Sequence, residues 1–214
     1  GTAPVYPQVK WMHEHGVDAD VIVGSKTKSL LILEKEMEAV AGNLISAFMS
    51  GVEPYDSIKV LSEMTYDDVQ KTLNERFDIV VSSLAFHYIE DFEGVVRDIY
   101  NMLDTEGIFI FSQEHPLCTC HSGGNRWTRD ELGNKIHLNL ADYGIEGERE
   151  SVWFVNNVKK YHRTFSTIIN TLISAGFSIE RMIEPLPTDE ILEQYPDYKD
   201  LFHKPDFLLL RVKK

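Results

Sequence analysis

The amino-acid sequence predicts an α/β fold with a doubly wound, mostly parallel sheet. Short apolar runs, suited to strands that are buried on both faces, alternate with stretches whose apolar residues recur at helical spacing. In 77–116 the strand Phe77–Val81 is followed by a helix and then by the strand Ile108–Phe111, which Gly107 introduces. This β-α-β order is typical of parallel sheets. One apolar stripe marks the helix: Phe92, Val95, Val96, Ile99, Met102 and Leu103.

The remaining elements continue this alternation along the chain. Before residue 77, the sequence predicts strands at 19–24 and 58–61 and helices at 28–41, 44–50 and 67–74. After residue 116, it predicts a hairpin of strands 150–155 and 158–163, turning at 156–157. A helix follows, capped by Thr164 or Ser166 and ended by Gly176. Two further strands are expected at 177–183 and 207–212.

Residues 117–160 interrupt the alternation. Cys118–Tyr143 is rich in Gly, Asn, Asp and Arg, and so long a loop in a compact domain is usually functional or mobile. We therefore expect a single domain over 1–214 with an insertion at 117–160.

Composition limits the classes of function. The 214 residues include 34 acidic and 21 basic side chains, a net charge of −13 that argues against a nucleic-acid partner. No apolar stretch approaches the roughly 20 residues that cross a bilayer, and the first residues do not resemble a signal peptide. With only two cysteines, Cys118 and Cys120, a reducing, cytoplasmic setting is the simplest expectation. The oligomeric state cannot be read from the sequence.

Polar residues follow both central strands where each strand ends. Ser82–Tyr88 comes after the first strand and Ser112–Pro116 after the second. Open α/β sheets bind ligands at the carboxyl ends of their strands, so these two segments predict one edge of a site.

The segment FDIVVSSLAFHYIEDFEGVVRDIYNMLDTEGIFIFSQEHP (77–116) closely resembles class I S-adenosylmethionine-dependent methyltransferases, especially the branch that methylates small molecules. The resemblance covers the chain from about Ile58 to the end. It implies a Rossmann-like, three-layer α/β/α fold whose last strand is antiparallel. It also implies S-adenosylmethionine as cofactor, a small-molecule substrate, and a substrate lid formed by the insertion at 117–160.

The cofactor-binding part of the family pattern is incomplete in this chain. No Gly-x-Gly-x-Gly motif is present, and one interpretation makes Gly1-Thr2 the tail of that loop and 7–16 the first helix. Lys26 or a neighbour stands where the family has its ribose-binding acid. Either the acid is replaced locally, or affinity is weakened, or the cofactor is not bound. The resemblance places cofactor contacts at Gly1, Glu63, Met64, Ser83 and Leu84.

Candidate residues for chemistry lie at the predicted site edge. His87 and His115 follow the two central strands, and an imidazole titrates near neutral pH, so either could be the base. Alternatively, His87 caps a helix or bonds to backbone. Tyr161, Arg163 and Trp153 could bind substrate, although Arg163 could equally form an ion pair with one of the many acidic side chains. The cluster of Cys118, Cys120 and nearby histidines lacks a second ligand pair, so no metal site is expected.

Two functions follow from these features. The first is a methyltransferase that uses S-adenosylmethionine on a small molecule. The second is a binding or regulatory protein that keeps the fold and has lost the cofactor. A nicotinamide-dependent oxidoreductase ranks last, because the chain lacks Gly-x-Gly-x-x-Gly.

Overall fold

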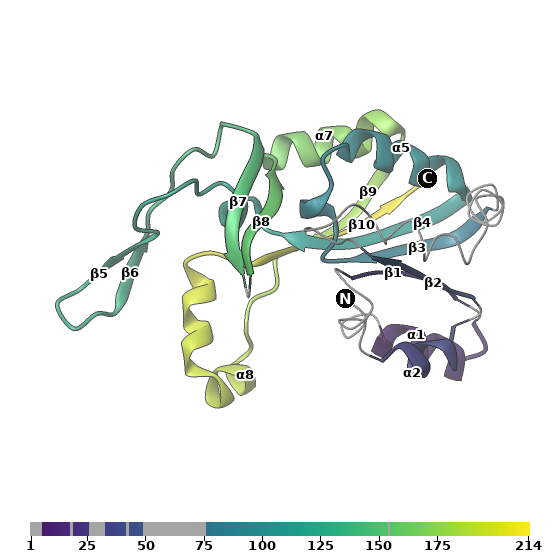
Figure 1. Cartoon of the computed structure of the whole chain (residues 1–214), viewed down its shortest axis with the longest axis horizontal. Coiled ribbons are helices and arrows are strands. Elements are labelled where there is room, and N and C mark those ends of the chain that lie inside the picture. The colour runs from purple at the N-terminus through teal and green to yellow at the C-terminus, as the bar shows by residue number, and fades with distance from the viewer. Residues whose placement is uncertain (1–5, 18, 26–32, 42, 49–75, 154) are drawn as a thin grey trace. The chain divides into compact units, whose positions relative to one another are not determined.

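The computed structural model describes residues 6–17, 19–25, 33–41, 43–48, 76–153 and 155–214 (Figure 1). The chain divides into two compact units, Gly1–Glu75 and Arg76–Lys214, and each is described by itself. The expectation of one domain over 1–214 stays a prediction. The strand and helix predicted at 58–61 and 67–74 lie outside the described residues.

In the first unit, two parallel strands pair in a regular register. β1 (Asp20–Ser25) and β2 (Asn43–Phe48) run from Asp20 opposite Asn43 to Ser25 opposite Phe48. Helices α1 (Tyr6–Glu14) and α2 (Glu34–Glu38) accompany them, and Val9, Val21 and Met37 form a small core.

Two expectations for this unit are confirmed, the helix at 7–16 and the strand at 19–24. The helix predicted at 44–50 is wrong, because residues 43–48 form β2. A short apolar run fits either element, and the hydrogen bonds to β1 decide for a strand. Of the helix predicted at 28–41, the described part contains only α2, and residues 28–32 lie outside it.

The second unit is built on a four-stranded sheet in the order β3-β4-β10-β9. β3 (Phe77–Ser83) is parallel to β4 (Leu103–Glu114). β10 (Phe207–Lys213) is antiparallel both to β4 and to β9 (Ser178–Ile183). The predicted α/β fold with an antiparallel last strand is therefore confirmed.

Helices α5 (Phe92–Met102) and α7 (Phe165–Ala175) cover one face of this sheet (Figure 1). Phe92, Val96 and Ile99 are buried on α5, which confirms its predicted apolar stripe. Leu103 belongs to β4 rather than to the helix, so the strand begins before Gly107. The core also contains Phe86, Leu103, Phe109, Phe111, Ile168, Leu172, Phe177, Leu208, Leu210 and Val212.

The predicted insertion forms two hairpins beyond the carboxyl end of β4 (Figure 1). It starts with the short helix α6 (Pro116–Thr119) and continues as β5 (Trp127–Arg129) and β6 (Lys135–Leu138). The second hairpin pairs β7 (Gly147–Trp153) with β8 (Val155–His162). Its use as a substrate lid stays a prediction.

The turn predicted at 156–157 is wrong, because Trp153 already pairs with Val155. In the observed register Glu150 lies opposite Lys159, although the like-charged Arg149 and Lys160 also lie opposite each other. Lys159 also contacts Glu148, with Nζ 3.0 Å from Oε2. Cross-strand pairs of this kind favour one register over its neighbours, a preference that the Asn156-Asn157 turn signal did not reveal.

Two short elements connect β9 to β10, helix α8 (Asp189–Gln194) and the 3-10 helix η3 (Pro196–Phe202). None of the helices in the described part of the chain is long and apolar enough to cross a membrane.

Candidate functional site

The turn after β3 is held against β4. Leu84 has a φ of 53°, and its N–H donates to the backbone oxygen of Ser112 at 2.9 Å and to the Ser112 hydroxyl at 3.2 Å. A left-handed conformation at a leucine costs about 1–3 kcal/mol and is found where surrounding contacts enforce it, often at functional sites. These contacts fix Ser83 and Leu84, two of the predicted cofactor residues, at the carboxyl edge of the sheet.

The 3-10 helix η2 (Phe86–Tyr88) then brings His87 next to the end of β4. His87 is 4% exposed, and its Nδ1 accepts a hydrogen bond from the Glu114 N–H at 3.2 Å. Burial, with a smaller contribution from the Lys160 charge, lowers the pKa of His87 to about 3. The imidazole is therefore neutral near pH 7 and carries its proton on Nε2, because the backbone occupies the Nδ1 lone pair.

Glu114 is the centre of this polar cluster. Its Oε1 lies 2.5 Å from Lys160 Nζ on β8 and 3.9 Å from His87 Nε2. Lys160 Nζ is also 5.9 Å from the centre of the Tyr88 ring. Burial and the Glu114 charge raise the pKa of Tyr88 to about 12. Tyr88 is consequently a neutral phenol, and Glu114 and Lys160 carry the charges of the cluster.

His115, the second predicted base, is 3% exposed and both of its ring nitrogens are engaged. Nδ1 accepts the Leu117 N–H at 3.1 Å and so caps α6, while Nε2 donates to Glu184 Oε1 at 2.8 Å. Burial lowers the pKa of His115, although Glu184 opposes this. These contacts indicate that His115 holds α6 in place, and a catalytic role for it stays a prediction.

The predicted substrate residues on β8 contact the loop after β3. Tyr161 donates its hydroxyl to Glu90 Oε2 at 3.2 Å. Arg163 donates to the backbone oxygen of Glu90 at 2.7 Å and to that of Ile89, and its guanidinium carbon lies 5.0 Å from the Phe92 ring centre. Arg163 thus fastens the loop to β8. Whether Tyr161 or Arg163 also binds substrate stays a prediction, and the side chain of Trp153 lies outside what is described.

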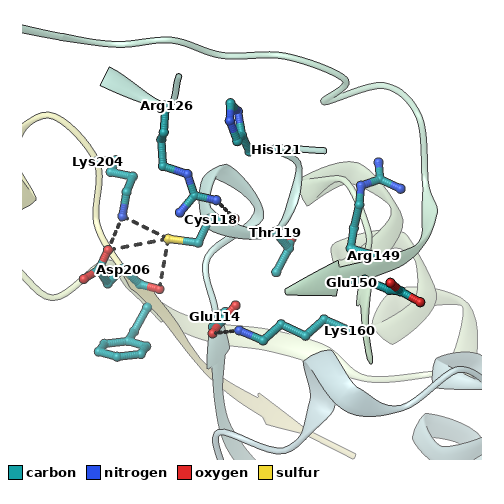
Figure 2. A pocket seen from close by; sticks show the side chains of 11 residues that line it. Glu114, Cys118, Thr119, His121, Arg126, Arg149, Glu150, Lys160, Lys204 and Asp206 are labelled. Carbon is teal, nitrogen blue, oxygen red and sulfur yellow. Dashed lines mark hydrogen bonds and ion pairs between the residues drawn. The ribbon is translucent and has the colours of Figure 1, made fainter. Parts of the chain in front are cut away.

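A cavity of about 280 Å³ opens beside Glu114 (Figure 2). Its walls come from the end of β4, from α6 and the segment after it, from β7 and β8, and from residues 204–207. Figure 2 shows Arg126, His121 and Arg149 on one side and Glu114 with Lys160 on the other. The described lining residues are Glu114, Cys118, Thr119, His121, Arg126, Arg149, Glu150, Lys160, Lys204, Asp206 and Phe207.

One pair in the cavity wall escaped the sequence analysis. Thr119 Oγ1 lies 2.8 Å from Nδ1 of His162, a fully buried histidine whose Nε2 donates to the Tyr143 backbone oxygen at 2.9 Å. Because Nε2 carries the ring proton, Nδ1 is the acceptor and the Thr119 hydroxyl donates to it. The two residues are 43 positions apart, and no local pattern in the sequence pairs them.

Burial keeps the two cysteine thiols protonated in this arrangement. Burial raises the pKa of Cys118 to about 11, even though Lys204 Nζ lies 3.2 Å from its sulfur. Within the described ranges, no group of three or more His, Cys, Asp or Glu side chains is arranged to hold a metal ion.

Three of the predicted cofactor residues, Gly1, Glu63 and Met64, lie outside the described residues, as does Lys26. Of the predicted cofactor set, the structure therefore places only Ser83 and Leu84.

Residues 42–111 match the family model for a methyltransferase domain. The fold is similar to that of a Listeria monocytogenes protein assigned as an S-adenosylmethionine-dependent methyltransferase, with a TM-score of 0.72 and 29% identity over 97% of this chain and 84% of that chain. An S-adenosylmethionine-dependent methyltransferase from Mesorhizobium loti has a TM-score of 0.70 and 29% identity over 95% and 84% of the two chains.

A protein of Haemophilus influenzae without an assigned function is 43% identical over 138 residues, which cover 64% of this chain and 54% of that protein. The chain thus spans about half the length of this curated relative.

The sheet order, the polar carboxyl edge and these similarities define a methyltransferase-type α/β protein. The comparisons support a class I S-adenosylmethionine-dependent methyltransferase, the fold to which the two solved structures belong.

Proposed function

We propose that the protein transfers a methyl group from S-adenosylmethionine to a small molecule bound in the cavity beside Glu114. The observation that carries this proposal is the position of Glu114, which ends β4 at the ligand-binding edge of the sheet and also lines the cavity. A volume of about 280 Å³ is slightly below the range for drug-sized ligand pockets, roughly 300–1,000 Å³, and suits a small acceptor.

S-adenosylmethionine supplies a methyl group that is already activated on a sulfonium. Ser83 and Leu84 fit a cofactor at this edge, because Ser112 holds their turn rigidly at the end of β3. Gly1, Glu63 and Met64 complete the proposed set.

The protein's own task is to align the acceptor atom and to remove its proton where one must leave. Glu114 can accept that proton, since its carboxylate lines the cavity and is 23% exposed. Lys160 keeps the carboxylate in place. His87 positions the Glu114 backbone through Nδ1, which leaves no free lone pair on the neutral imidazole for a base. These contacts favour Glu114 over the predicted bases His87 and His115.

Calorimetric titration with S-adenosylmethionine and S-adenosylhomocysteine tests the cofactor directly. We expect binding of both compounds. If neither produces heat nor shifts the melting temperature, the protein is a binding or regulatory relative, and the enzyme proposal fails.

Glu114→Gln tests the chemical step. Release of S-adenosylhomocysteine from a panel of small acids, amines and phenols should fall by about 10²–10⁴-fold if Glu114 is the base, with cofactor affinity unchanged. Glu148→Gln is the matched control, because Glu148 pairs with Lys159 and does not belong to the described cavity lining. Equal rates in both variants would remove Glu114 from the mechanism.

A further inference from the structure

The cavity differs in charge from the rest of the protein. The whole chain has a net charge of −13. The described lining nevertheless contains four basic and three acidic side chains, a formal charge of +1. The basic members are Arg126, Arg149, Lys160 and Lys204, and the acidic members are Glu114, Glu150 and Asp206.

Two of the four cations are neutralised by neighbours. Lys160 pairs with Glu114, and the nearly buried Lys204 pairs with Asp206 (Figure 2). The third acid, Glu150 on β7, is exposed and lies opposite Lys159. The remaining positive charge therefore belongs to the two arginines.

Arg126 and Arg149 are held by backbone carbonyls. Arg126 donates to the Cys118 oxygen at 2.7 Å. Arg149 donates to the oxygens of Cys120 at 3.5 Å and Glu148 at 3.1 Å, and also to that of Ile145. None of the ion pairs found among the described residues involves either guanidinium. Carbonyls orient a guanidinium without cancelling its charge, and most of the Arg126 N–H groups stay available.

The two guanidiniums lie at the same short segment of the chain. Arg126 donates to the Cys118 oxygen and Arg149 to the Cys120 oxygen, two residues further on. An oriented guanidinium can bind a carboxylate or a phosphate with two parallel hydrogen bonds. Two such groups on one wall make an anion site stronger than a single exposed arginine would.

His121, drawn between the two arginines in Figure 2, adds an independent sign of a ligand. Its Nδ1 is buried and has no hydrogen-bond partner among the described residues, while Nε2 lies 3.2 Å from the Gly124 oxygen. Buried polar atoms without a partner are rare and costly in folded proteins. Because Nε2 donates to the Gly124 carbonyl, Nδ1 of the neutral ring is an acceptor, and a hydroxyl or N–H group of a bound molecule would satisfy it.

We propose that Arg126 and Arg149 bind an anionic group, a carboxylate or a phosphate, on the molecule that is methylated, and that a hydroxyl or N–H group of the same molecule donates to His121 Nδ1. The inference rests on the proposed function, and it makes the acceptor a small organic acid or phosphate ester. Glu114 lies on the opposite wall, so binding the anion at the arginines directs the other end of the molecule toward Glu114.

Binding of simple anions, measured by calorimetry without cofactor, tests this site. The probes are inorganic phosphate, malonate and the uncharged malonamide. Phosphate or malonate should bind the wild-type protein and malonamide should not, and the tighter of the two anions identifies the acidic group. Arg126→Gln and Arg149→Gln should each weaken anion binding by about 10- to 100-fold.

Arg129→Gln is the matched control for Arg126→Gln. Arg129 lies three residues further along the same segment and also donates to a carbonyl, that of Gly133 at 2.7 Å, but does not belong to the described lining. Its anion affinity should equal that of the wild type. If a glutamine variant loses its circular dichroism spectrum, Arg126→Lys and Arg149→Lys replace it. These keep the charge and should bind anions more weakly than the wild type.

The inference is overturned if neither anion binds the wild-type protein, if malonamide binds as tightly as malonate, or if Arg129→Gln loses as much affinity as Arg126→Gln. Failure of anion binding with intact S-adenosylmethionine binding would reject this site alone. Anion binding without cofactor binding would keep the site and reject the proposed methyl transfer.

Discussion

Replacing His87 by asparagine should reduce the pH dependence of the stability of the unit that contains it. His87 is buried beside Glu114, and burial followed by the Lys160 charge lowers its pKa from 6.5 to about 3. The asparagine Oδ1 can take the place of Nδ1 and accept the Glu114 N–H, but asparagine does not titrate. The variant therefore keeps the hydrogen bond and removes the proton equilibrium.

The sign and size of the effect follow from linkage. Between pH 3 and 6.5 the unfolded chain binds a proton at residue 87 that the folded chain excludes, so unfolding becomes easier as the pH falls. The stabilisation is fully present above pH 6.5 and is lost progressively toward pH 3. At about 1.4 kcal/mol per pKa unit the whole effect is about 5 kcal/mol, of which about 2 kcal/mol is lost by pH 5.

Urea denaturation followed by circular dichroism at pH 8 and pH 5 measures this difference. The wild-type protein should lose about 2 kcal/mol more unfolding free energy between the two pH values than His87→Asn does. The buried His115 and His162 contribute equally to both proteins and cancel. His137→Asn, at an exposed site on β6, should behave as the wild type. Identical pH dependence in His87→Asn and the wild type would refute the reasoning.

Three further outcomes are expected. Gly176→Ala should lower the unfolding free energy by about 1–3 kcal/mol, because φ is 109° and a Cβ would lie 2.9 Å from the Tyr100 ring. Gly133→Ala is the control: the space around Gly133 is open, so the loss of unfolding free energy should be smaller in the same denaturation experiment. Arg163→Met should cost about 1–3 kcal/mol in urea denaturation, because the partly buried Ile89 carbonyl loses its donor, whereas water can reach the exposed Glu90 carbonyl. A loss below about 0.5 kcal/mol would contradict the loop-fastening role. Lys160→Met should raise the pKa of His87 above about 3 yet leave it below 6.5 in an NMR titration, since burial is the larger cause; a pKa at 6.5 would contradict this.

Local signals predicted those elements whose ends are set by neighbouring residues. Helix α7 begins where the Thr164 hydroxyl accepts the Thr167 N–H at 3.2 Å, and it ends at Gly176 in the left-handed conformation. Both features depend on residues within a few positions, so the cap and the stop can be read from the sequence. The polar segments after β3 and β4 were predictable in the same way.

Pairing with distant residues decided the elements that were predicted wrongly. The run at 43–48 carries no signal that excludes a helix, and only β1 makes it a strand. The turn between β7 and β8 likewise depends on which charged residues of the two strands face each other. In both cases the local sequence of a segment does not reveal which distant strand it pairs with.

The sequence by itself determined the fold class and the resemblance to methyltransferases, because strand runs and caps are local patterns. Its polar strand ends predicted one edge of a site. Only the tertiary structure decided what each side chain does there. In the folded chain, ring nitrogens of His87 and His115 form hydrogen bonds with backbone and carboxylate groups. Folding also brings residues between 114 and 207 together around one cavity. Hydrogen-bond partners, burial and charge pairing are properties of contacts between distant segments, and these exist only after the chain has folded.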